Sequence, residues 1–308
     1  MKNFKKIFLI AIGVVIIIVV LLPYVLSVET DELDGNIRSK TPGKYVQLSK
    51  GWTHYEISGP EKGKTVLLVH GFSCPYFIWD STVTSLTKAG FRVIRFDLWG
   101  RGTSDRPDVT YDISLFKSQI EELLKKLNIN KPFDIVGLSM GGAVSAAFVG
   151  DNPNLIRKVV LLDPFSEKAK LFPINIPIVG SYIVSTVIIP SSPNKQSFDV
   201  QNPDKIPSDW KEKIRAQMKF KGFTRAIFST LINTIGQDPR PYFEKMGKQK
   251  KQSLVFWGEK DKTTPAGTGI YLKKVLNCDY RLVANAGHLV HVDAPDLVYS
   301  EIIKFLSK

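Results

Sequence analysis

Short apolar runs alternate along the chain with segments in which apolar residues recur at helical spacing. Continuous apolar runs without polar alternation are typical of strands buried on both faces of a parallel sheet. The runs that predict strands are 44–50, 52–58, 65–69, 91–96, 133–136, 156–162, 253–257 and 280–283. Helices are predicted over 75–88, 113–127, 270–276 and 295–306. Strands that alternate with helices predict an α/β protein with a mostly parallel, doubly wound sheet.

The stretch Gly137-Leu138-Ser139-Met140-Gly141 lies where the predicted strand 133–136 turns into a run of small residues, 142–148. A sharp strand-to-helix turn needs glycines, because a side chain at either flank would clash. The serine at the apex is pushed outward, and its hydroxyl faces a helix N-terminus, where backbone N–H groups favour negative charge. The pattern therefore predicts Ser139 as a nucleophile.

The alternation stops after Asp163-Pro164 and resumes at residue 253. The intervening residues are rich in Pro, Ser and Lys and contain irregular apolar patches such as 174–189. Residues 165–251 are therefore predicted to form an insertion over the site. Within 164–252, fifteen Lys/Arg stand against seven Asp/Glu, so about +8 of the formal net charge of +13 lies there.

The first segment is predicted to be a membrane anchor. Lys2, Lys5 and Lys6 precede a run of twenty uncharged residues, 7–26, which as a helix spans about 30 Å, one hydrocarbon core. Basic residues stay on the cytoplasmic side, so the remaining chain is expected outside. The alternative is a signal peptide cleaved near Ser27, with secretion of the protein.

These patterns divide the chain into four predicted parts. They are an anchor or signal segment (1–28), a polar linker (29–43), a core (44–164 and 252–308) and a cap (165–251).

The charge of the chain limits its expected binding partners, and its cysteine content indicates whether disulfides form. The excess of basic residues is compatible with nucleic acid, an anionic membrane surface or simple solubility. No zinc-type cysteine spacing or RNA-binding signature supports nucleic acid, which is therefore not expected as a partner. Cys74 and Cys278 are expected to be two free thiols. The sequence predicts no oligomeric state.

Together these residues resemble the α/β-hydrolase family, in particular its cap-bearing, esterase- and lipase-like serine hydrolases. The motifs that carry the resemblance span about residues 44–308. In chain order they are His70-Gly71-Phe72, the run Asp97-Leu98-Trp99-Gly100-Arg101-Gly102-Thr103-Ser104, the Ser139 turn, Trp257-Gly258-Glu259-Lys260-Asp261 and Ala286-Gly287-His288.

A serine hydroxyl is a weak nucleophile until a base takes its proton, and histidine is the base whose pKa suits neutral pH. An acid then holds that histidine in one tautomer and stabilises its cation. The chain order of the family is Ser, then Asp or Glu, then His, which implies the triad Ser139, Asp261 and His288. Asp261 and His288 each follow a predicted strand, at the carboxyl edge where open α/β folds bind ligands.

Some alternatives remain open at this stage. Asp163, which ends an earlier predicted strand, and Glu259 compete with Asp261 for the acid. His291 competes with His288. Asp97 is expected to hold its glycine-rich turn.

Two further histidines are not expected to react. His70 is expected to brace its loop, and His54 lies in an early strand away from the site.

The resemblance also implies an oxyanion hole made by the backbone N–H groups of Phe72 and Met140. A serine rather than an aspartate at the turn departs from dehalogenases and epoxide hydrolases and implies acyl-enzyme chemistry. No metal-ligand cluster appears, and Gly100-Arg101-Gly102 is not a nucleotide fingerprint, so neither a metal nor a cofactor is expected.

The expected function is hydrolysis of a carboxylic ester by an enzyme at the outer face of the cell membrane. Apolar runs and positive charge in the insertion lead to the hypothesis of a lipid-like ester as substrate. A small soluble ester is the alternative substrate. Other activities of the fold stay open, namely thioesterase, amidase, carbon–carbon bond hydrolase, cofactor-free haloperoxidase and acyltransferase, as does a binding protein without catalysis.

Overall fold

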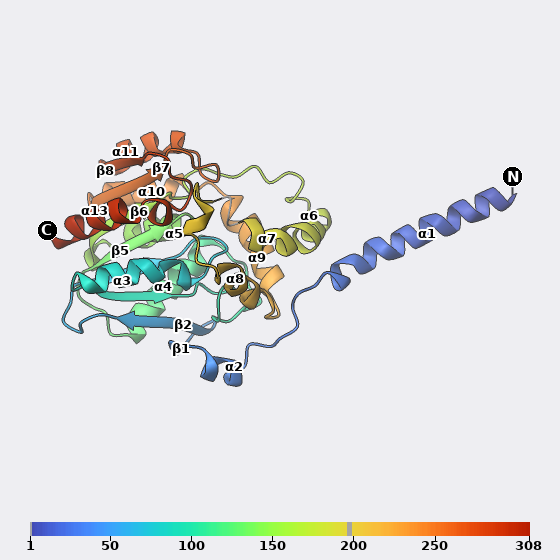
Figure 1. Cartoon of the computed structure of the whole chain (residues 1–308), viewed down its shortest axis with the longest axis horizontal. Helices are drawn as coiled ribbons and strands as arrows, with labels where there is room; N and C mark the ends of the chain where they lie inside the picture. Colours follow the sequence, from blue (N-terminus) through green and yellow to red (C-terminus); the bar gives the residue numbers. More distant parts are fainter. Residues whose placement is uncertain (1, 196–198) are drawn as a thin grey trace.

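The computed structural model describes residues 2–195 and 199–308, and the strands among them form one eight-stranded sheet in the order β1-β2-β4-β3-β5-β6-β7-β8 (Figure 1). β2 pairs antiparallel with β1 and β4, and every other neighbouring pair is parallel. The strands are β1 (Lys44–Leu48), β2 (Gly51–Ser58), β3 (Thr65–Val69), β4 (Arg92–Phe96), β5 (Phe133–Leu138), β6 (Ile156–Leu162), β7 (Gln252–Gly258) and β8 (Asp279–Val283). The predicted α/β class with a mostly parallel sheet is confirmed.

Helices cover both faces of this sheet. One face packs against α4 (Ile113–Lys126), α5 (Met140–Asp151), α10 (Arg240–Lys248) and α11 (Gly269–Leu276). The other face packs against α3 (Asp80–Lys88) and α13 (Pro295–Ser307). The helix predicted over 75–88 begins as a separate 3-10 turn, η1 (Tyr76–Trp79), and a short helix, α12 (Val290–Asp293), was not predicted from the sequence.

The chain between β6 and β7 is mostly helical, although its sequence predicts no helix. Its elements before α10 are α6 (Pro177–Ile183), the π-helical turn η3 (Val184–Ile188), α7 (Ile189–Lys195), η5 (Pro203–Lys205), α8 (Trp210–Met218), α9 (Phe223–Thr230) and the π-helical turn η6 (Leu231–Ile235). Prolines and π-helical turns interrupt the periodicity by which helices are recognised.

Two side chains tie these helices to the loop after β4. In α8, Gln217 accepts a hydrogen bond from the Gly102 N–H (2.9 Å), and in α9 the Thr230 hydroxyl accepts one from Arg101 (2.9 Å). The helices α8 and α9 therefore lie over the carboxyl edge of the sheet. α10 instead packs beside α5.

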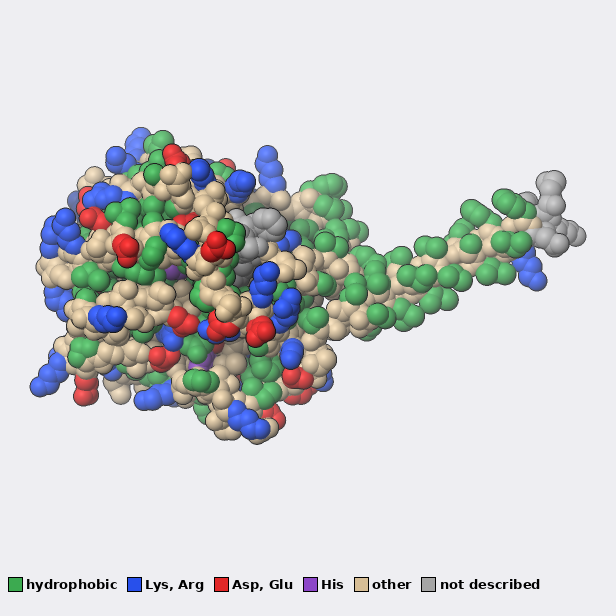
Figure 2. Space-filling model, in the orientation of Figure 1, with side chains coloured by type: hydrophobic (Ala, Val, Ile, Leu, Met, Phe, Trp, Pro, Cys, Tyr) green, Lys and Arg blue, Asp and Glu red, His purple; other side chains and the backbone are tan. Residues whose placement is uncertain are grey.

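The N-terminal helix α1 (Lys2–Val25) projects away from the rest of the chain (Figure 1). Its segment Lys6–Val25 has a mean hydropathy of 3.1, and none of it is buried against the protein. Hydrophobic side chains cover it along its length (Figure 2). By length and composition this helix is a candidate membrane span.

The residues after α1, expected as a linker, lie against α8 and α9. The Thr30 and Asp31 N–H groups both donate to the Lys219 carbonyl (2.8 and 2.9 Å), and Lys221 N–H donates to Asp31 O (2.9 Å). Further along, α2 (Gly35–Lys40) is held through an ion pair between Arg38 and Asp105 (2.5 Å).

Glu29 supplies the N-terminal cap of α9. Gly222 stands at the N-cap position and has no side chain to accept the free N–H groups at the start of that helix. The Glu29 carboxylate accepts the Gly222 N–H (2.6 Å) and the Thr224 N–H (2.5 Å) instead. A negative charge at a helix N-terminus is also favoured by the helix dipole.

We expect Glu29→Ala to lower the free energy of unfolding by about 1–2 kcal/mol, the usual cost of a lost N-cap. The matched control is Glu32→Ala, because among the described residues Glu32 forms an ion pair only with Lys221 (2.8 Å), and both side chains are more than half exposed. An exposed pair of this kind contributes about 0–1 kcal/mol. Urea denaturation of the two detergent-solubilised variants measures the difference, and equal losses would contradict the capping role of Glu29.

Candidate active site

Ser139 stands at the turn between β5 and α5 with φ 52° and ψ −121°, a strained conformation for a residue with a side chain. Its two flanking glycines are required by close backbone approach. A Cβ on Gly141 would lie 2.2 Å from the Val69 carbonyl oxygen, and one on Gly137 would lie 2.6 Å from the Gly141 carbonyl oxygen. The predicted strand–turn–helix geometry around Ser139 is therefore present.

His288 and Asp261 are paired with each other. His288 Nδ1 lies 2.9 Å from Asp261 Oδ2, and both side chains are almost completely buried. The other carboxylate oxygen of Asp261 accepts the N–H groups of Thr263 (2.8 Å) and Thr264 (2.9 Å). Burial raises the pKa of Asp261, but the hydrogen bond and charge of His288 outweigh it and leave that pKa below its usual range.

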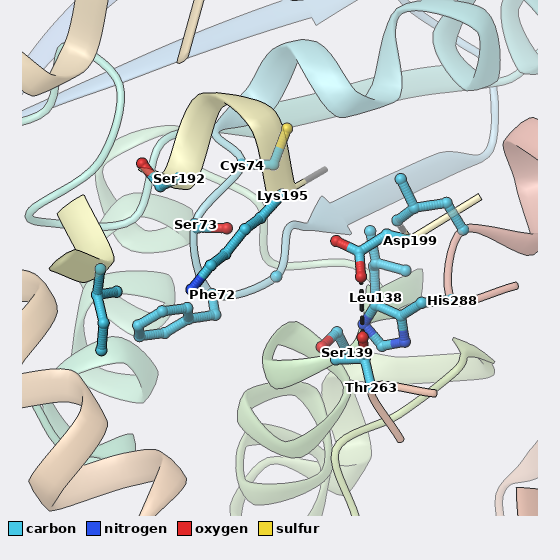
Figure 3. A pocket seen from close by; sticks show the side chains of 13 residues that line it. Phe72, Ser73, Cys74, Leu138, Ser139, Ser192, Lys195, Asp199, Thr263 and His288 are labelled. Carbon is cyan, nitrogen blue, oxygen red and sulfur yellow. Dashed lines mark hydrogen bonds between the residues drawn. The ribbon is translucent and has the colours of Figure 1, made fainter. Parts of the chain in front are cut away.

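Ser139 and His288 line one cavity of about 510 Å³ (Figure 3). Among the described residues no hydrogen bond joins the two side chains. Because Nδ1 of His288 faces Asp261, Nε2 is the nitrogen left to take a proton. Catalytic hydrogen bonds are often formed only once the substrate is bound.

Neither rival acid contacts His288 through a hydrogen bond in the described chain. Asp163 ends β6 with φ 42°, and its Oδ1 accepts the Gly258 N–H (2.7 Å). Complete burial raises the pKa of Asp163 well above its usual range and so disfavours the carboxylate form that a triad acid needs. Glu259 accepts the Asn285 N–H (3.1 Å).

The rival base, His291, points elsewhere. Its Nε2 lies 3.3 Å from the Ile78 carbonyl oxygen, and its ring packs 5.3 Å from that of Trp79. Burial lowers the pKa of His291 to about 4, so it stays neutral.

Asp97 and two other histidines hold the loops around the site. The Asp97 carboxylate accepts the N–H groups of Tyr76 (2.8 Å) and Thr103 (3.0 Å), as expected for a residue that stabilises its turn. It also pairs with buried His54 (2.8 Å), a partnership that the sequence did not predict. His70 bonds to the Gly71 carbonyl through Nδ1 (2.8 Å) and accepts the Leu98 N–H at Nε2 (2.9 Å), so it braces two loops.

Both predicted oxyanion donors belong to segments next to Ser139. Met140 is the first residue of α5, so its N–H has no partner within the helix. A Cβ on Gly71 would lie 3.2 Å from Ser139 Cβ, which shows how closely the loop carrying Phe72 approaches the serine.

Arg101 fixes that loop. Its buried guanidinium donates to the Phe72 carbonyl (2.9 Å) as well as to Thr230 of α9. Arg101 belongs to the motif 97–104, but nothing in that motif predicts this connection between the oxyanion loop and α9.

The cavity also contains residues of the insertion that the sequence analysis did not single out. Asp199 accepts a hydrogen bond from the Thr263 hydroxyl (2.8 Å) beside His288, and Ser192 and Lys195 come from the other side of the cavity (Figure 3). Ile188 also lines the cavity. The remaining lining is largely apolar, with Phe72, Leu138 and Leu289. No local sequence pattern indicates these positions, because they lie far from Ser139 in the sequence and come near it only in the tertiary structure.

The only set of described side chains with the spacing of a metal site is Asp163, Asp261 and His288, whose ligand atoms lie within 4.8 Å of one another. The hydrogen bonds described above already engage Nδ1 of His288 and both oxygens of Asp261. These hydrogen bonds are those of a histidine base oriented by a carboxylate.

The environment of His288 makes a prediction for the pH dependence of any reaction that uses it as a base. Burial lowers the pKa of His288, but the hydrogen bond and charge of Asp261, with smaller effects of Asp163 and Asp199, raise it to about 9. His288 can act as a base only when it is neutral, so kcat/KM should decrease as the pH is lowered through its pKa. The midpoint of this acid limb should lie above 6.5, the usual pKa of histidine.

We expect Asp199→Asn to move this acid limb to lower pH, because removal of a nearby negative charge disfavours the imidazolium. Asparagine can still accept the bond from Thr263. The pH profile of kcat/KM checks this, with Asp204→Asn, an exposed position of the same insertion, as the control. An unchanged profile in the Asp199 variant would show that its charge does not reach His288.

Comparison with known proteins identifies hydrolases as relatives of this chain. The family model described as alpha/beta hydrolase fold matches residues 64–295. Human monoacylglycerol lipase ABHD6 is 26% identical over 82% of this chain and 78% of its own length. A 2-hydroxy-6-oxononadienedioate/2-hydroxy-6-oxononatrienedioate hydrolase of Pseudomonas putida is 26% identical over 88% of this chain and 99% of its own length. The crystal structure of the enol-lactonase from Burkholderia xenovorans LB400 superposes with a TM-score of 0.74 at 20% identity, covering 86% of this chain and 100% of that one.

Proposed function

This chain belongs to the α/β-hydrolase family and is an enzyme of that fold, and we propose that it is a membrane-anchored serine hydrolase of carboxylic esters. One observation carries the proposal. Ser139 stands at a strained turn and shares a cavity with His288, which Asp261 holds through Nδ1 at 2.9 Å.

In the proposed reaction His288 takes the proton of Ser139 at Nε2 as Oγ attacks the ester carbonyl. Asp261 keeps the proton on Nδ1 and stabilises the imidazolium. The N–H groups of Phe72 and Met140 stabilise the tetrahedral oxyanion, and each such donor contributes about 2.7–4 kcal/mol. His288 then protonates the leaving alcohol, and water hydrolyses the acyl-enzyme by the same steps in reverse.

The proposed substrate is a lipid-like ester with an apolar acyl chain. Phe72, Leu138, Ile188 and Leu289 give the cavity an apolar lining, and its volume of about 510 Å³ suits a molecule larger than a short soluble ester. The human relative is named as a monoacylglycerol lipase, which supports the same class of substrate for this chain.

The proposed location is the outer face of a cytoplasmic membrane. Lys2, Lys5 and Lys6 precede the apolar run, while Glu29, Asp31 and Glu32 follow it. Basic residues are retained on the cytoplasmic side, so the domain after α1 would be outside. In this proposal α1 is retained as the anchor, and residues 165–251 act as the cap over a core formed by 44–164 and 252–308.

A second candidate is hydrolysis of a carbon–carbon bond. The Pseudomonas putida relative, which matches over 99% of its own length, is named for a reaction on a dioate. Such a dianionic substrate needs cationic partners, and among the described lining residues Lys195 is the one lysine or arginine. The apolar lining therefore favours the ester.

The test is turnover by the full chain, reconstituted in vesicles, of monoacylglycerols of increasing acyl length beside a matched series of soluble esters and a dienedioate. We expect kcat/KM to rise with acyl length and to be higher on anionic vesicles, because the cap carries an excess of positive charge. No preference for long chains and no response to anionic vesicles would contradict a lipid-like substrate. Turnover of the dienedioate alone would favour the second candidate.

A further inference from the structure

Exposed apolar side chains gather on one part of the insertion. Outside α1, ten large apolar side chains of the described residues are exposed, and five of them lie within 172–187. We call this group the apolar cap face; its members, with their exposed fractions, are Phe172 (80%), Ile176 (41%), Ile178 (85%), Val179 (41%) and Val187 (56%). Isolated exposed apolar residues are ordinary, but a gathered set marks an interaction surface.

The apolar cap face lies beside the end of α1. Tyr24 and Leu26, at the end of that helix, line a small cavity together with Ser185 of η3 and Ile189 of α7. α6 stands on the side of the domain from which α1 leaves (Figure 1), and hydrophobic side chains continue from this region towards the helix (Figure 2).

The residues that follow α1 hold this arrangement in place. Val28 packs against the core beneath the insertion, and Glu29 caps α9 through two backbone N–H groups. The anchor therefore joins the cap by a fixed attachment and not by a loose tether. When α1 spans a bilayer, the surface next to its end must lie at the lipid headgroups, and the apolar cap face is that surface.

The same helical stretch has a second, inward side. Val187 faces outward, whereas the next residue, Ile188, lines the cavity that holds Ser139, as does Ser192 one turn later. The stretch from α6 to α7 is therefore a single wall between the exposed apolar face and the cavity.

We propose that the apolar cap face is a second membrane contact, which embeds in the leaflet next to α1 and sets the wall of the cavity against lipid. The inference rests on the anchoring part of the proposed function and not on the ester chemistry. Apolar side chains at the interface gain burial in the acyl region, while the basic residues of the cap can stay at the headgroups.

The experiment places an environment-sensitive NBD fluorophore on the full chain in lipid nanodiscs. In a Cys74→Ser, Cys278→Ser background, Ile178→Cys carries the label in one sample and Ile270→Cys in the other. Ile270, on α11, is a matched control because it is also an exposed isoleucine (71%) but lies away from α1. We expect the label at 178 to shift to shorter wavelength and to lose most of its emission when doxyl lipids are included, and the label at 270 to do neither.

Two results would overturn the proposal. One is emission at position 178 that stays at the aqueous wavelength and unquenched, as at 270. The other is a blue shift without quenching by doxyl lipids, which would mean that protein covers this face. Because Cys74 lines the cavity of Ser139, reaction of the unlabelled wild-type chain with a fluorophosphonate tests the proposed serine chemistry separately. Failure of that chemistry is then distinguishable from failure of the membrane contact.

Discussion

Replacing Ser139 with alanine is expected to abolish turnover while leaving the fold intact. Among the described residues the Ser139 hydroxyl makes no hydrogen bond, so its removal leaves no buried partner unsatisfied. Loss of the nucleophile removes the covalent route and costs about 10⁶-fold in kcat in a serine protease. Steady-state kinetics on any ester that the wild type cleaves measures the effect.

The control for this variant is Ser192→Ala, which removes a hydroxyl from the opposite wall of the same cavity. It should alter KM more than kcat. If Ser139→Ala kept more than about a thousandth of the wild-type rate, far above the residual that a loss of about 10⁶-fold leaves, another residue would be the nucleophile.

The second large effect is expected at the triad acid, where Asp261→Asn should slow catalysis by about 10⁴-fold. The amide presents its NH₂ or its oxygen to His288 without the negative charge, so the ring is no longer held with its proton on Nδ1 and the imidazolium is not stabilised. Asp163→Asn is the matched control. Burial raises the pKa of Asp163 and disfavours its charged form, so a neutral amide is a smaller change there than at Asp261.

The kcat values of the two variants decide between the acids. Equal losses, or a larger loss in Asp163→Asn, would transfer the role to Asp163. Circular dichroism of both variants separates a catalytic effect from a folding defect.

The core of the fold could be predicted because its strands are continuous apolar runs, and their mostly parallel pairing follows from alternation with helices. The strand 156–162, for example, was predicted with the bounds that the structure has for β6. The turn at Ser139 was predictable for a related reason, since two glycines are needed where backbone segments approach within a Cβ radius.

The insertion could not be predicted in the same way. Its helices are short and contain Pro177 and Pro193, and two of its turns are π-helical, so no period of 3.6 residues stands out. The roles of Asp199 and Arg101 could not be predicted for another reason. Their roles depend on partners far along the chain, Thr263 and Thr230, which only the tertiary structure brings near.

The central claim, that Ser139 is activated by His288, is tested most directly by a covalent label. The full chain in its membrane is treated with a fluorophosphonate, and the adduct is located by peptide mass spectrometry in the wild type, Ser139→Ala and His288→Ala. The account predicts one adduct, on Ser139, that is absent from the first variant and forms much more slowly in the second. An adduct on another residue, or a folded wild type that does not react, would contradict it.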